Sequence, residues 1–83
     1  MKTATKLKKL DGFAGISALY KLSEPLKDFE YVIVSASTIV GVETYIFGSN
    51  EDGEVLDWDE LPGSVRGVYD HTVALNDAGY EVE

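Results

Sequence analysis

The chain has 83 residues, no cysteine and a formal net charge of -8. This length predicts a single domain with one small core, and the lack of cysteine excludes disulfides, thiolate metal sites and cysteine nucleophiles. The lack of cysteine also fits a reducing cytoplasm, where we expect the protein to be located. Because no apolar run approaches the roughly 18 residues that span a bilayer, we expect no membrane span.

The charge is unevenly distributed along the sequence. Residues 1–27 carry a net charge of +4, whereas residues 28–83 carry -12. A fold this acidic is repelled by nucleic acid and by anionic membranes, so we expect no direct binding to either. Such a charge favours a partner with a basic surface, although acidity also serves solubility.

The first part of the sequence is predicted to contain an arm and a strand. Residues 1–11 have the composition of a basic flexible arm that precedes a single α+β domain over 12–83. The stretch ISALYKL, residues 16–22, alternates as a strand does, with Ala18, Tyr20 and Leu22 on one face. A helical interpretation over residues 7–19 competes with it, because apolar residues recur there at a spacing of three, although Gly12 and Gly15 disfavour a helix.

A buried strand and a hairpin follow. EYVIVSAS, residues 30–37, is rich in β-branched and aromatic residues and predicts a strand that is covered on both faces. Residues 43–49 and 54–58 predict an antiparallel hairpin joined by the turn NEDG. We favour this turn over a calcium loop, because the first ligand position of such a loop would fall on Gly48, which has no side chain to ligate.

A short helix is predicted near the end of the sequence. Asp70 is a suitable N-cap, and Gly79 is a suitable left-handed stop with Tyr80 folding back onto the helix. The residues YEVE alternate as a final edge strand would. The sequence therefore predicts an α+β fold, with a small antiparallel sheet of three to five strands and one C-terminal helix packed on one face.

Catalytic and cofactor motifs are not recognised. Ser64 and His71 could pair with a carboxylate, but nothing resembles a nucleophile elbow, and His71 is interpreted as a structural residue of the first helical turn. The sequence contains no phosphate loop, dinucleotide fingerprint or zinc spacing. We therefore predict no enzyme activity, no catalytic residue, no cofactor and no metal.

The candidate functional feature is a surface around the single tryptophan. Strand alternation predicts that Trp58 faces the core while its neighbours point outward. Alternatively, Trp58 is a contact residue, because tryptophan, tyrosine and arginine are enriched at binding hot spots. The predicted protein-binding residues are Asp57, Trp58, Asp59, Glu60, Arg66 and Tyr69.

Several stretches resemble a group of small uncharacterised proteins encoded by actinobacterial phages: LYKLSEPL, YVIVSAS, ETYIFGSNEDGEVLDWDELPGSVRG and DHTVALNDAGYEV. This resemblance implies a phage origin and the cytoplasm of a bacterial host. A partial resemblance to HicB-type antitoxins covers residues 44–78, through Asp52-Gly53, the ELPG turn and Ala74-Leu75.

Together these observations predict a small acidic phage accessory protein that acts without catalysis by binding a host protein. Alternatives are a DNA mimic that inhibits a nucleic-acid-binding protein, or a HicB-like antitoxin. A homodimer is also compatible with the sequence.

Overall fold

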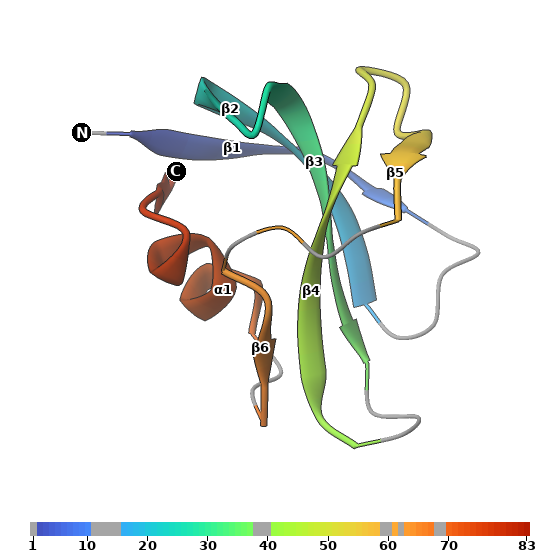
Figure 1. Cartoon of the computed structure of the whole chain (residues 1–83), viewed down its shortest axis with the longest axis vertical. Helices are drawn as coiled ribbons and strands as arrows, with labels where there is room; N and C mark the ends of the chain where they lie inside the picture. The colour runs from blue at the N-terminus through green and yellow to red at the C-terminus, as the bar shows by residue number, and fades with distance from the viewer. Residues whose placement is uncertain (1, 11–15, 38–40, 59–60, 62, 68–69) are drawn as a thin grey trace.

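The structure is a computed structural model that describes residues 2–10, 16–37, 41–58, 61, 63–67 and 70–83. Its elements are β1 (Thr3–Leu10), β2 (Ile16–Leu26), β3 (Phe29–Ser37), β4 (Glu43–Ser49), β5 (Val55–Asp57), β6 (Val65–Arg66), α1 (His71–Asp77) and β7 (Glu81–Val82) (Figure 1).

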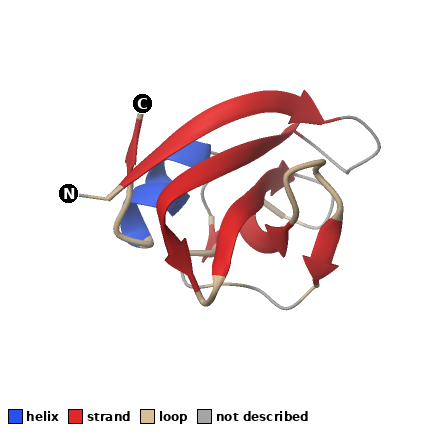
Figure 2. Ribbon diagram, turned by 90° about the horizontal axis from the view of Figure 1, so that it is seen from above, coloured by secondary structure: helices blue, strands red, loops and turns tan. Residues whose placement is uncertain are grey.

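The described strands form one sheet of seven, in the order β5-β4-β3-β2-β1-β7, with β6 also paired to β4. β7 runs parallel to β1, and the other pairs are antiparallel. Seen from above, the sheet curls into a half barrel beside the short helix (Figure 2). The predicted sheet of three to five strands is therefore wrong. β6 has only two residues, is held by backbone pairing with β4 and is too short to show an apolar period, whereas β7 lies within the YEVE stretch that predicted a final edge strand.

The predicted flexible arm is also wrong where the structure describes it, because Thr3–Leu10 form β1. β1 pairs with β2 from Ala4 to Leu10, and β7 pairs with Thr3 and Ala4 on its other side. Only Ala4 of this strand is fully buried. Backbone pairing with β2 and with β7, rather than burial of its own side chains, therefore orders this lysine-rich segment.

The main core lies between the sheet and α1. The prediction of a strand covered on both faces is confirmed for β3, whose residues 32–36 are all buried. The cluster on the helix side comprises Ala4, Ala18, Tyr20, Leu22, Val32, Val34, Ile46, Leu61, Ala74, Leu75 and Tyr80. The predicted face of β2 is thus confirmed, since Ala18, Tyr20 and Leu22 all belong to this core.

The opposite face of the sheet is partly closed by its own curl. Leu19 and Ile33, which pair across β2 and β3, are fully buried on this face. Lys8 Nζ donates a hydrogen bond of 3.2 Å to the Asp52 carbonyl, and a Cβ on Gly53 would come within 3.2 Å of the Leu10 side chain. The end of β1 therefore contacts the β4–β5 turn.

The predicted helix ends are confirmed. The Asp70 side chain accepts a hydrogen bond of 2.9 Å from the Thr72 amide. At the other end Gly79 has a φ of 97°, and the amides of Gly79 and Tyr80 donate to the carbonyls of Asn76 and Leu75. This is the bonding of a Schellman motif. Among the described residues, no helix is long and apolar enough to cross a membrane.

Candidate protein-binding surface

The β4–β5 hairpin positions the candidate surface. Asn50 fixes its turn, because its side-chain oxygen accepts hydrogen bonds of 3.0 Å from the amides of both Asp52 and Glu54. Gly53 follows with a φ of 86°. The interpretation of NEDG as a hairpin turn is confirmed by this bonding, which returns the chain alongside β4.

Three aromatic side chains form a row on this hairpin, which we call the aromatic strip: Tyr45, Phe47 and Trp58. The ring centroids of Tyr45 and Phe47 are 6.0 Å apart and nearly parallel, and those of Phe47 and Trp58 are 5.4 Å apart at 60°. Phe47 pairs with the buried Ile33, so the strip lies on the sheet face opposite α1. The strip combines three π-surfaces at one edge of the sheet.

Trp58 is the exposed end of this strip. It is 66% exposed, the highest value among the exposed large apolar side chains of the described residues. The prediction from alternation that it faces the core is wrong. β5 ends at Asp57, and the register between β4 and β5 shifts between Gly48 and Ser49. Such a bulge breaks the two-residue period on which that prediction depended.

The structure separates the other predicted contact residues. Asp57 is half-buried and pairs with Gly48, whereas Arg66 is exposed on β6 and pairs with Glu43. These two positions lie at opposite ends of β4 (Figure 1), about 16 Å apart at the usual rise of a strand. Arg66 therefore does not adjoin Trp58. Asp59, Glu60 and Tyr69 lie outside the described residues.

Sequence reasoning missed three contributors to this surface: Tyr45, Phe47 and Leu56. Tyr45 and Phe47 alternate on β4, and the Tyr45 hydroxyl donates a hydrogen bond to the Glu43 carboxylate. Leu56 is 60% exposed and lies two residues before Trp58. Aligning the two arms of the predicted hairpin would have placed Trp58 near Phe47, since residues across a hairpin are neighbours.

His71 joins α1 to β2 through hydrogen bonds of both ring nitrogens. Its Nε2 lies 2.8 Å from the Ile16 carbonyl, and its Nδ1 lies 3.2 Å from the Tyr20 hydroxyl. Because a carbonyl only accepts, Nε2 carries the proton, and Nδ1 accepts from Tyr20. Burial lowers the pKa of His71 and raises that of Tyr20. Ser64 instead accepts from the Ile46 amide and donates to the Leu61 carbonyl.

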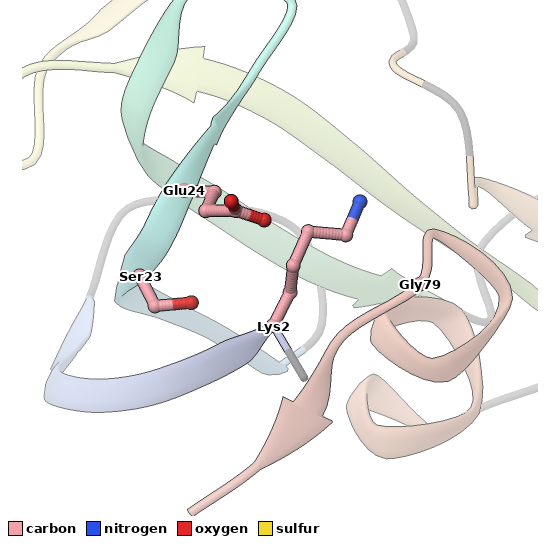
Figure 3. Close-up of a pocket in the computed structure, with 4 residues that line it drawn as sticks. All are labelled: Lys2, Ser23, Glu24 and Gly79. Carbon is pink, nitrogen blue, oxygen red and sulfur yellow. The ribbon is translucent and has the colours of Figure 1, made fainter.

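A hollow of about 660 Å³ is lined by Lys2, Ser23, Glu24 and Gly79 (Figure 3). The Lys2 ammonium lies 4.7 Å from the ring centre of Tyr80, and the Ser23 hydroxyl accepts from the Thr3 amide. These contacts join β1 to β2 and to the turn before β7. The hollow contains none of the predicted contact residues.

The aromatic strip is thus the strongest candidate for a functional surface. Exposed aromatic rings bind partners through apolar contact and cation–π interaction. Comparison of the chain with protein-family models, with curated proteins and with solved structures finds no match.

Proposed function

We propose that this protein is a non-catalytic binding module whose contact surface is the aromatic strip with Leu56 and Asp57. The exposure of Trp58 carries this proposal, because leaving a tryptophan ring in water forgoes a large hydrophobic gain. A buried tryptophan at the centre of an interface is a frequent hot spot.

The charge around the strip indicates the chemistry of the partner. Exposed Glu51, Asp52 and Glu54 lie in and directly after the turn of the hairpin, and Asp57 precedes Trp58. A basic protein surface complements these carboxylates and is attracted to them before contact. The proposal that this partner is a host protein rests on the resemblance of the sequence to proteins of actinobacterial phages.

The first test compares Trp58→Ala with Val73→Ala. Val73 is also an exposed apolar residue, but it lies on α1. The tagged proteins would be incubated with lysate of an actinobacterial host, and captured proteins identified by mass spectrometry. We expect one partner whose recovery falls by about 30-fold with Trp58→Ala, the loss typical of a hot-spot residue of about 2 kcal/mol. Recovery with Val73→Ala should be unchanged.

A second variant tests the charge, with Asp57, Asp59 and Glu60 each replaced by lysine. We expect capture of the basic partner to be lost. Equal recovery by the wild type, the Trp58→Ala variant and the charge-reversed variant would contradict the proposed function. Urea unfolding of each variant would verify that it remains folded.

A further inference from the structure

We propose that the hollow lined by Lys2, Ser23, Glu24 and Gly79 binds a small zwitterion of the α-amino acid type. Its volume of about 660 Å³ falls within the range of small-molecule sites. The hollow shares no residue with the aromatic strip, so this binding site is separate from the proposed function. The charges that line the hollow identify the class of ligand.

A cation and an anion face the same hollow from two segments of the chain. Lys2 directly precedes β1, and Glu24 lies in β2. The charged groups of both side chains project into the hollow (Figure 3). Both residues belong to the described part of the chain, and the structure records no ion pair between them. A ligand with one negative and one positive group can therefore form a charged hydrogen bond with each.

The Lys2 ammonium is held in place by its surroundings. It lies 4.7 Å from the ring centre of Tyr80, and the Lys2 carbonyl accepts a hydrogen bond of 2.9 Å from the Glu81 amide. Gly79 leaves room for the ammonium, since a Cβ at this position would come within 3.3 Å of Lys2 Nζ. The cation–π contact with Tyr80 covers one side of the ammonium and leaves N–H donors for a carboxylate.

Ser23 and Glu24 supply the other hydrogen-bonding groups. The Ser23 oxygen accepts from the Thr3 amide at 2.8 Å, so its hydroxyl hydrogen is left to donate to a ligand carboxylate. The Tyr80 hydroxyl donates to the Glu24 carbonyl at 2.7 Å and fixes the backbone of that residue. The Glu24 carboxylate accepts hydrogen bonds, and an ammonium group donates three. The carboxylate of the ligand is therefore assigned to Lys2 and Ser23, and its ammonium to Glu24.

L-Leucine and two analogues test this assignment on the wild-type chain. N-acetyl-leucine keeps the carboxylate but lacks the ammonium, and leucinamide keeps the ammonium but lacks the carboxylate. Amide chemical shifts of the isotope-labelled protein report binding at Thr3, Glu24 and Gly79. We expect leucine to saturate these shifts with a dissociation constant on the order of 1 mM, since a ligand this small has few atoms that contribute. Each analogue should bind at least about fivefold more weakly, because it loses a charged hydrogen bond.

Two variants separate the roles of the charged residues. With Glu24→Gln, leucine should lose its advantage over N-acetyl-leucine and keep its advantage over leucinamide. Lys2→Gln should give the opposite pattern. Glu51→Gln, which removes an exposed carboxylate of the β4–β5 turn, should change neither. The amide spectrum of each variant shows whether it is folded.

Three results would overturn the zwitterion site: equal binding of leucine and both analogues, shifts that do not saturate, or identical effects of Glu24→Gln and Glu51→Gln. The proposed function of the aromatic strip would stand in each case, because it depends on Trp58.

Discussion

His71 is the only histidine of the chain, and its pKa differs between the folded and the unfolded state. This difference makes the stability of the fold depend on pH. Burial lowers its pKa below the ordinary value of 6.5, and the Lys6 charge acts in the same direction. The hydrogen bond to the Ile16 carbonyl and the charge of Asp70 oppose this shift. Protonation would also place a hydrogen on Nδ1, where the neutral ring accepts from Tyr20.

We therefore expect stability to fall as the pH decreases from about 6.5 toward the lower pKa of the folded state, because the unfolded chain binds the proton more tightly. Above 6.5 the contribution of His71 is fully present. Urea unfolding between pH 7.5 and 5.5 measures this, with His71→Gln as the control. If the wild type and this variant lost stability in parallel, the effect would not belong to His71.

At the scale of the element, α1 is short and depends on its ends. It has seven residues, with Ala74 and Leu75 as its buried side chains. Asp70→Ala removes the acceptor of the Thr72 amide, and we expect the free energy of unfolding to fall by about 1 kcal/mol.

Asp77→Ala is a matched control for this substitution. Asp77 is exposed in the last turn, where a carboxylate opposes the helix dipole. Replacing Asp77 by alanine should leave the free energy of unfolding unchanged or raise it by roughly a few tenths of a kcal/mol. Thermal or urea unfolding of both variants distinguishes the two positions, and equal losses would assign the effect to the general removal of charge.

The elements that could be predicted from sequence are those defined by local chemistry. The Asn50–Gly53 turn and the Asp70 and Gly79 helix ends each depend on side-chain or backbone bonds within a few residues. β1 could not be found in this way, because its own side chains are mostly exposed, and it is ordered by backbone pairing with β2, the next strand, and with β7 at the far end of the chain. Trp58 was misplaced for a related reason, since a bulge in its hairpin changed the register.

At the scale of the whole molecule, the charges are segregated across the sheet. The lysines lie on or beside β1 and β2 and in the turn after β2, whereas the hairpin of β4 and β5 carries Glu51, Asp52 and Glu54. Because the sheet curls, the Lys8 ammonium reaches the turn of this hairpin. The curl of the sheet thus brings a lysine of β1 into hydrogen-bonding contact with the backbone of the acidic turn.

The lysines of β1 should also keep the protein from associating through that edge. We expect the pair Lys6→Thr and Lys9→Thr to cause concentration-dependent association, because it removes two of the three lysines on this strand and leaves its edge less protected. The pair Lys21→Thr and Lys27→Asn changes the net charge equally, from -8 to -10, away from this edge. Sedimentation velocity should show larger species for the first pair alone. Association of both double variants would attribute the effect to the change in net charge and not to the edge of β1.

The pairing of β7 with β1 has a consequence for the order of folding. Thr3 lies opposite Glu81, and the Glu83 amide donates to the Ala4 carbonyl, so the first described strand is completed by the last. Contacts between residues so distant in sequence carry a high loop-closure entropy and form slowly. The hairpins of β2, β3 and β4 can form early from neighbouring residues. Closure of β7 onto β1 must wait until the intervening chain is arranged, which makes this short strand a late step in reaching the native state.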